Sequence, residues 1–226
     1  MRIGKYIANA GYCSRRDAEK LIFKKKVKIN NAICEHPSEK VTEKDSIKIN
    51  NKIIKINYRL RLWRMNKPIK YICTNRDQKK RKTVFDLIPK NFPRMISIGR
   101  LDFMTEGLLL FTNNGDYARK LELPNSNIEK TYKVLVKGKV LKKEIKKINK
   151  GIEINGFFYK KIKVEIKKNY QDLYWLNIKL KEGKNREIRK ICNYFEWKIN
   201  KLIRTQFGPY KLSSLSMGKI EEIEIK

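Results

Sequence analysis

The sequence predicts an α+β protein with a small N-terminal domain, built from two helices and a short hairpin-rich sheet, and a larger domain with a mixed, largely antiparallel sheet. Helical periodicity is confined to a few short segments, alternating strand patterns dominate beyond residue 131, and Asn-Asn turns divide short strands near the N-terminus. At roughly 150 residues per domain, a chain of 226 residues suggests one or two domains. We expect two domains, at residues 1–57 and 58–226.

Two helices are expected at the start of the chain. Apolar residues recur at helical spacing over residues 3–10, and Gly11 follows as a stop signal. Ser14 and Asp17 fit the capping-box pattern that begins a second helix, with Asp17 reaching back to the cap. The apolar stripe of this second helix consists of Ala18, Leu21 and Ile22.

A near-repeat follows these helices. Residues 27–33 and residues 47–53 both alternate apolar and polar side chains and then break at an Asn-Asn pair. Because Asn tolerates the left-handed conformations that tight turns need, both segments are predicted to be strand-turn-strand units.

The larger domain is predicted to begin with a strand. Residues 58–68 alternate basic and apolar side chains, which is typical of a half-exposed strand, and residues 75–82 are expected to form a polar basic loop. Residues 108–112 predict a short buried strand. Asp116 is then expected to cap a helix that continues to about Leu121.

Beyond residue 131 the pattern is mostly that of strands. Helices are expected only at about residues 140–150, ending at Gly151, and at about 186–195. Three sets of residues are each expected to share one strand face: Tyr132, Val134 and Val136; Ile162, Val164 and Ile166; and Leu176, Ile178 and Leu180.

The charge of the chain indicates a polyanionic partner. There are 55 Lys and Arg residues against 23 Asp and Glu, a formal net charge of +32. Drift toward AT-rich coding exchanges Arg for Lys, but it does not create such an excess, so nucleic acid is the expected partner. No apolar run approaches the ~18 residues of a membrane helix. The N-terminus also lacks the apolar region of a signal peptide.

The rare residues exclude several kinds of active site. His36 is the only histidine and lies in a polar stretch typical of a surface loop, which disfavours histidine-based catalysis. No C-x-x-C pairing occurs among the four cysteines, Cys13, Cys34, Cys73 and Cys192, so a zinc knuckle is not expected. Their wide spacing predicts free thiols in a reducing cytoplasm. A P-loop is absent from the sequence. Catalysis would therefore depend on carboxylates, Tyr, Lys or Arg.

The arginines are clustered, which singles out candidate specific contacts. Pairs or groups occur at residues 15–16, 59–64, 94–100 and 186–189, with a further Arg at 204, whereas residues 120–185 contain only Lys as the basic residue. The planar guanidinium makes bidentate and stacking contacts that an ammonium does not. Chance clustering remains an alternative.

A carboxylate in residues 99–116 is the candidate for chemistry. Asp102 follows Arg100 and lies among apolar residues, an environment that keeps a carboxylate ionised but poorly hydrated, as a nucleophile requires. From spacing alone, an Asp that follows an Arg is more often an ordinary turn residue or part of a surface ion pair.

Residues 1–57 resemble the S4 RNA-binding domain. The residues that carry this resemblance are those from Ile7 to Ile22, including the Ser-Arg-Arg-Asp-Ala-Glu run, followed by residues 27–30. The resemblance implies that Arg15 and Arg16, in the first turn of the second helix, form a basic edge for phosphates together with Lys24 near its end. A solvated charged face is the alternative.

The remaining sequence resembles the RsuA/RluB branch of rRNA pseudouridine synthases. The Gly-Arg-Leu-Asp-x-x-Thr-Glu-Gly-Leu-Leu-Leu run at residues 99–110 resembles the signature of that family, and other motifs agree in the same order. These are found at residues 61–68, 130–132, 182–190, 202–209 and 215–219. The large-subunit, RluB-like subgroup fits best, through Arg-Leu-Trp-Arg at residues 61–64 and Asn-Arg-Glu at residues 185–187.

This resemblance implies specific roles. Asp102 would be the nucleophile or ribose-activating carboxylate, Tyr132 would stack on the base and act in removing the C5 proton, and Arg189 would pair with Asp102. Leu202 would pack beneath the base, and Arg100 would line the RNA path. The expected RNA-binding residues are Arg15, Arg16, Lys24, Arg64, Lys67, Asn185, Arg186 and Arg204.

The implied reaction isomerises uridine to pseudouridine in rRNA, most simply in the large subunit, without a metal or organic cofactor. The uridine would be flipped or unpaired. A small-subunit target, a non-catalytic ribosome-assembly protein, and a basic protein that binds tRNA or DNA remain alternatives. A cytoplasmic monomer is the simplest expectation.

Overall fold

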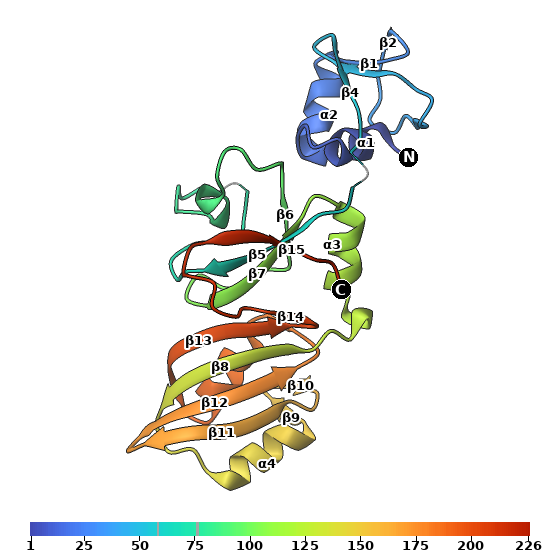
Figure 1. Cartoon of the computed structure of the whole chain (residues 1–226). Coiled ribbons are helices and arrows are strands. Elements are labelled where there is room, and N and C mark those ends of the chain that lie inside the picture. Colours follow the sequence, from blue (N-terminus) through green and yellow to red (C-terminus); the bar gives the residue numbers. More distant parts are fainter. Residues whose placement is uncertain (58, 76) are drawn as a thin grey trace. The chain divides into compact units, whose positions relative to one another are not determined.

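The computed structural model describes residues 1–57, 59–75 and 77–226 (Figure 1). The chain separates into two compact units. The first comprises Met1–Arg61, Lys90–Ile96 and Thr112–Asp116, and the second comprises Leu62–Pro89, Ser97–Phe111 and Tyr117–Lys226. The expected domain boundary between residues 57 and 58 stays a prediction, and residue 58 itself lies outside the described residues.

The N-terminal unit contains two helices and a four-stranded sheet. The helices are α1 (Ile3–Asn9) and α2 (Arg15–Phe23). The sheet has the order β2-β1-β3-β4 and consists of β1 (Val27–Ile29), β2 (Ala32–Ile33), β3 (Ile47–Ile49) and β4 (Lys52–Ile54). Ile3, Ile7, Ile22, Val27 and Ile47 are among the fully or almost fully buried residues of its core.

Local sequence signals account for the boundaries of these elements. Gly11 has a φ of +78°, a left-handed conformation that suits the end of a helix. Ser14 caps α2, because its Oγ accepts a hydrogen bond from the Asp17 N–H at 3.1 Å, while its hydroxyl donates to the Asp17 carboxylate at 2.6 Å. The Asn-Asn pairs at residues 30–31 and 50–51 all have positive φ, as two-residue hairpin turns require. The predicted helices and both strand-turn-strand units are confirmed.

A mixed nine-stranded sheet forms the centre of the rest of the chain, in the order β11-β12-β8-β13-β7-β5-β15, with β14 beside β13 and β6 beside β7 (Figure 1). Its strands are β5 (Leu62–Lys67), β6 (Ile96–Ile98), β7 (Glu106–Thr112), β8 (Lys130–Lys137), β11 (Lys163–Tyr170), β12 (Leu173–Leu180), β13 (Lys198–Phe207), β14 (Tyr210–Lys211) and β15 (Ile220–Ile223).

The other elements are helices and a separate hairpin. The helices are α3 (Gly115–Glu122), α4 (Lys142–Lys150) and α5 (Glu187–Tyr194), with short 3-10 turns η1 (Val84–Leu87) and η2 (Pro124–Ser126). Strands β9 (Ile152–Ile154) and β10 (Phe157–Tyr159) form the two-stranded hairpin. Among the described residues, no helix combines the length and apolar character needed to cross a bilayer.

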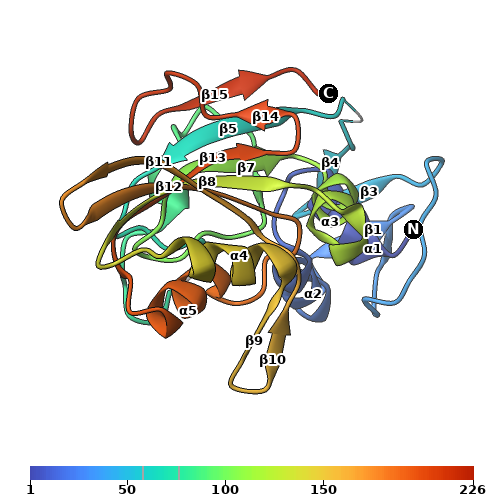
Figure 2. The same cartoon turned by 90° about the horizontal axis from the view of Figure 1, so that it is seen from below.

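One hydrophobic core holds α4 and α5 against the sheet. Ile148 of α4 and Ile191 of α5 pack with Val134 and Val136 of β8 and with Leu176 of β12. Figure 2 shows both helices on the same side of these strands. This packing fixes the N-terminal end of α5, which carries the predicted active-site arginine.

Strands β7 and β13 pair in parallel at an unusually close approach. Gly107 lies opposite Arg204, and its φ is +101°. A Cβ at residue 107 would collide with the carbonyl oxygen of Arg204. Glycine is therefore required here both for its backbone conformation and for the space between the strands.

The structure corrects three details of the predicted elements. β5 is mostly buried rather than half-exposed, with only Arg64 and Asn66 partly exposed, and it lies between β7 and β15 in the sheet. Ile166 is 36% exposed, and the register between β11 and β12 shifts directly after it. Asp116 lies in the first turn of α3, and the Asn114 side chain accepts its backbone N–H at 2.9 Å, so Asn114 provides the cap.

Candidate active site

Asp102 lies in the loop between β6 and β7. The loop leaves β6 through Gly99, whose φ is +70°, and it turns at Asp102, whose carbonyl accepts the Thr105 N–H at 3.0 Å. The Asp102 side chain is 34% exposed. It therefore remains accessible from a cleft while its backbone is held in a tight turn.

Two arginines flank the Asp102 carboxylate. Arg189 Nε and Arg186 Nη1 each lie 3.6 Å from Asp102 Oδ2, a distance typical of ion pairs rather than hydrogen bonds. Arg189 also donates from Nη2 to the Met104 carbonyl at 2.7 Å and to Thr105 Oγ1 at 3.2 Å. Arg189 therefore contacts the loop that carries Asp102 as well as the Asp102 carboxylate.

The two arginines differ in exposure. The Arg189 side chain is 16% exposed, and burial together with the charge of Arg186 lowers the pKa of its guanidinium, which Asp102 opposes. The Arg186 side chain is 53% exposed. Arg186 precedes α5 with a φ of +53°, a left-handed conformation that is uncommon outside glycine and is often found at functional sites.

Strands β8 and β13 supply the floor of the site. Tyr132 on β8 lies opposite Arg204 on β13, and Leu202 lies opposite Val134. Leu202 is 4% exposed, and Tyr132 packs partly against the same core. Both side chains line the cleft that contains Asp102. The three predicted catalytic residues and the predicted apolar support therefore meet in one place.

Arg204 is buried beneath the cleft rather than exposed along an RNA path. It is 3% exposed, its Nε donates to the Leu108 carbonyl at 2.8 Å, and its guanidinium lies 5.3 Å from the centre of the Phe207 ring. Within the described residues, Arg204 Nη2 has no hydrogen-bond partner, although Arg204 contributes to the cleft wall. The Nη2 group of Arg204 is thus available as a hydrogen-bond donor beneath the cleft.

Two other predicted RNA contacts are used inside the protein. Lys67 is fully buried, and its ammonium donates to the carbonyls of Pro68, Asp102 and Thr105 at 2.9, 3.2 and 2.7 Å. Burial lowers its pKa to about 8. The Arg64 guanidinium binds the Glu221 carboxylate at 2.6 Å and the Lys211 carbonyl. Lys67 is therefore held inside the protein, whereas the Arg64 side chain stays 21% exposed and its contact with RNA stays a prediction.

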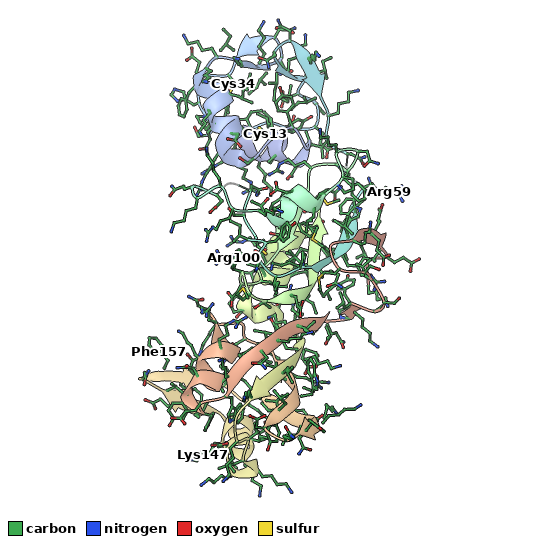
Figure 3. The ribbon with its side chains drawn as sticks, turned by 90° about the vertical axis from the view of Figure 1, so that its left-hand side faces the viewer. Cys13, Cys34, Arg59, Arg100, Lys147 and Phe157 are labelled. Carbon is green, nitrogen blue, oxygen red and sulfur yellow. The ribbon has the colours of Figure 1, made fainter. Side chains whose placement is uncertain are left out.

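The remaining predicted contacts lie at the surface. Arg100 is exposed and lines the cleft, and Asn185 is exposed just before Arg186. In the N-terminal unit, the residues predicted to bind phosphates are all exposed along α2 or at its end: Arg15, Arg16 and Lys24. Figure 3 shows Arg100 among the side chains of the larger unit.

The cleft is large and basic. It has a volume of about 1370 Å³ and is lined by eleven Lys or Arg residues against five Asp or Glu residues. This exceeds the ~300–1,000 Å³ of typical small-molecule sites, so the cleft has room for more than one nucleotide. Its charge suits a phosphate backbone.

Sequence reasoning missed several residues of this site. Arg186 was expected to contact RNA, yet it lies as close to Asp102 as Arg189 does. Glu187 is 4% exposed, and burial raises the pKa of its carboxyl group. Its Oε2 accepts a hydrogen bond from the Lys184 N–H at 2.9 Å. Cys73 Sγ lies 3.4 Å from both backbone polar atoms of Leu101, the residue before Asp102. The sequence signal for Arg186 and Glu187 was their position within three residues of Arg189, the predicted partner of Asp102.

Comparison with known proteins agrees with this geometry. The RNA pseudouridylate synthase family matches residues 61–194, and the S4 domain matches residues 1–47. A crystal structure of a pseudouridylate synthase superposes with a TM-score of 0.70 at 27% sequence identity, covering 99% of this chain and 96% of that one.

Relatives that match over most of their length are described as pseudouridine synthases. A Rickettsia bellii protein described as an uncharacterized RNA pseudouridine synthase is 45% identical over 225 residues, covering 100% of this chain and 97% of the relative. A ribosomal large subunit pseudouridine synthase B of Buchnera aphidicola subsp. Schizaphis graminum is 39% identical over 214 residues, covering 92% of this chain and 83% of the relative.

The fold, the basic cleft and these matches define an RNA-modifying isomerase with an RNA-binding module. The chain belongs to the RNA pseudouridylate synthase family and has an N-terminal S4 domain. The expected fold and enzyme class are therefore confirmed.

Proposed function

We propose that this enzyme converts a specific uridine of large-subunit rRNA into pseudouridine. The observation that carries this proposal is the Asp102 carboxylate, held between Arg186 and Arg189 in a basic cleft that Tyr132 and Leu202 also line. The relatives described as large subunit synthases support the choice of rRNA subunit.

The isomerisation breaks the bond between N1 and the ribose C1′, turns the uracil, and joins C5 to C1′. The C5 proton is lost and N1 gains a proton, so no oxidant or reductant is needed. Asp102 acts as the nucleophile or ribose-activating carboxylate, and the two arginines favour its anionic form. Tyr132 stacks on the uracil and takes part in removing the C5 proton, while Leu202 supports the base from below.

The target uridine enters the cleft by flipping out of its stack. Flipping costs a few kcal/mol in paired RNA and less in a loop, so an unpaired uridine in a hairpin is the favoured substrate. The S4 domain, through Arg15, Arg16 and Lys24, binds neighbouring phosphates and contributes to the choice of site. The enzyme acts as a monomer in the cytoplasm, where its four free thiols stay reduced.

The decisive variant is Asp102→Asn. Tritium release from rRNA labelled at uridine C5 should fall by more than about 1,000-fold, because the reacting carboxylate is lost. RNA affinity should be retained, since phosphate contacts are untouched. Undiminished turnover by the variant would refute the role of Asp102. A wild-type protein that binds rRNA without releasing tritium would favour the alternative of a non-catalytic assembly factor.

The rRNA subunit is tested separately. Carbodiimide treatment and reverse transcription of rRNA from a strain lacking the gene should reveal one missing stop in the large-subunit RNA. Loss of a stop in the small-subunit RNA would contradict the proposed target.

A further inference from the structure

The β9–β10 hairpin presents two aromatic side chains to solvent. Phe157 is 65% exposed and Phe158 is 58% exposed, immediately after the Asn155-Gly156 turn. Figure 2 shows the hairpin extending past α4 and α5, and Figure 3 shows Phe157 at its free end. The next residue, Tyr159, is 2% exposed and anchors the hairpin in the core.

The two phenyl groups have different neighbours. The ammonium of Lys190, on α5, lies 5.6 Å from the centre of the Phe157 ring. The Phe158 ring instead lies over Gly151, where its Cζ would be 3.0 Å from an added Cβ. Adjacent residues of a strand point to opposite faces, so Phe157 faces α5 and Phe158 faces away from it.

The base of the hairpin joins the cleft that contains Asp102. Lys160 and Lys161 follow β10 directly and line the cleft, as does Lys184. The Lys184 ammonium donates to the Phe158 carbonyl at 2.5 Å, which ties the hairpin to the loop that precedes α5. The aromatic tip is thus connected to the wall of the active-site cleft.

Lysines flank the hairpin, and Glu153 on β9, which lies opposite Phe158, is the acidic residue of its two strands. Lys161 and Lys190 have no acidic partner within the described residues, whereas Lys160 and Lys184 share Glu182. Exposed aromatic rings set among unpaired lysines are the arrangement by which proteins bind single-stranded RNA, because the rings stack on bases while the cations hold the backbone.

We propose that Phe157 is a stacking site for an unpaired base of the substrate RNA, outside the pocket of the target uridine. This deepens the proposed function and rests on it. Lys190 and Lys161 hold the adjacent phosphates, and the hairpin favours RNA whose nucleotides near the target are unpaired. A second copy of the chain is the competing occupant of the exposed ring.

The test compares Phe157→Ala with Phe158→Ala in the full-length protein. The two residues are almost equally exposed and share one hairpin, so they form a matched pair. Affinity is measured by fluorescence anisotropy, with a short oligouridine and a blunt RNA duplex as probes at one salt concentration. Phe157→Ala should bind oligouridine about tenfold more weakly and the duplex unchanged, because stacking needs an unpaired base.

Further measurements keep the outcome unambiguous. Phe157→Tyr should restore oligouridine binding, and the tryptophan fluorescence of Phe157→Trp should be quenched by oligouridine. Unchanged binding by Phe157→Ala, an equal loss in Phe158→Ala, or an equal loss on the duplex would each overturn the proposal. Self-association that disappears in Phe157→Ala, with RNA affinity intact, would assign the ring to a second copy instead.

The result does not depend on the proposed chemistry. Oligouridine binding is scored without turnover, so a failure of Asp102-dependent pseudouridine formation would leave the stacking site standing. With cognate rRNA, Phe157→Ala should raise KM about tenfold and leave kcat unchanged, since the ring is outside the reacting pocket.

Discussion

Replacing Arg189 with Met should lower kcat far more than replacing Arg186 with Met, although both arginines lie 3.6 Å from the Asp102 carboxylate. At that distance one ion pair is worth between about 1 kcal/mol in water and about 5 kcal/mol at an effective dielectric constant of about 20. The Arg186 side chain is 53% exposed and the Arg189 side chain is 16% exposed, so the weaker value applies to Arg186 and a stronger one to Arg189.

Arg189 has a second role that Arg186 lacks. Its two hydrogen bonds, to the Met104 carbonyl and to Thr105 Oγ1, position the loop that carries Asp102. We expect Arg189→Met to cost about 3–4 kcal/mol of transition-state stabilisation, a fall in kcat of about 100- to 1,000-fold. Arg186→Met should cost about 1 kcal/mol, or about fivefold. Arg189→Lys keeps the charge but not the forked donor, so its activity should fall in between.

The assay is steady-state tritium release at saturating RNA, which gives kcat, with RNA affinity and thermal unfolding measured on the same preparations. A decrease confined to kcat, with RNA affinity near the wild-type value, supports a role at the reacting carboxylate. If Arg186→Met lowers kcat as much as Arg189→Met does, the argument from exposure and loop positioning is refuted.

Three further outcomes are expected. Burial lowers the pKa of Lys67 from 10.5 to about 8, so the unfolded chain binds more protons than the folded protein between these pH values. The free energy of unfolding in urea, taken as wild type minus Lys67→Met, should therefore rise with pH across this window and level off on either side. Gly107→Ala should lower the free energy of unfolding by more than about 3 kcal/mol in a melting experiment, because the added Cβ would collide with Arg204. Gly156→Ala should cost about 1 kcal/mol in the same experiment, because Gly156 has a positive φ but open space around it, and equal losses would exclude the steric cause. Changing both Arg15 and Arg16 to Gln should flatten the slope of log affinity against log salt by about 1.5 in an RNA titration, and an unchanged slope would remove these arginines from the phosphate contacts.

Elements governed by local sequence were predictable. The capping of α2 by Ser14 and the two Asn-Asn turns depend on residues within a few positions of one another, and the structure contains all of them. The helices α4 and α5 and the inward faces of β8 and β12 also follow from periodicity, because one side of each is buried in a single core.

Features set by distant partners were not predictable from one sequence. The alternation at residues 58–68 indicated a half-exposed strand, but most side chains of β5 are buried, and Lys67 donates from its ammonium to backbone carbonyls inside the protein. The second arginine on Asp102 depends on the left-handed backbone of Arg186, which residue type alone does not specify. The Asn155-Gly156 pair is a turn signal for the β9–β10 hairpin, but strands of three residues are too short for periodicity to predict them.

The parallel contact between Gly107 and Arg204 has a consequence for folding. These residues lie almost half the chain apart, and closing so long a loop is costly in entropy before the contact forms. The hairpins and the antiparallel pair β11 and β12 join strands that are close in sequence, and β8 pairs with β12 across 36 to 50 residues, so these pairings are expected to form before that of β7 with β13. Asp102 precedes β7, whereas Tyr132 and Leu202 lie on β8 and β13, so the proposed active site is assembled only when this pairing closes. During refolding, the recovery of catalysis would therefore lag behind the recovery of secondary structure, and a nascent chain would acquire activity only after β13 has been synthesised.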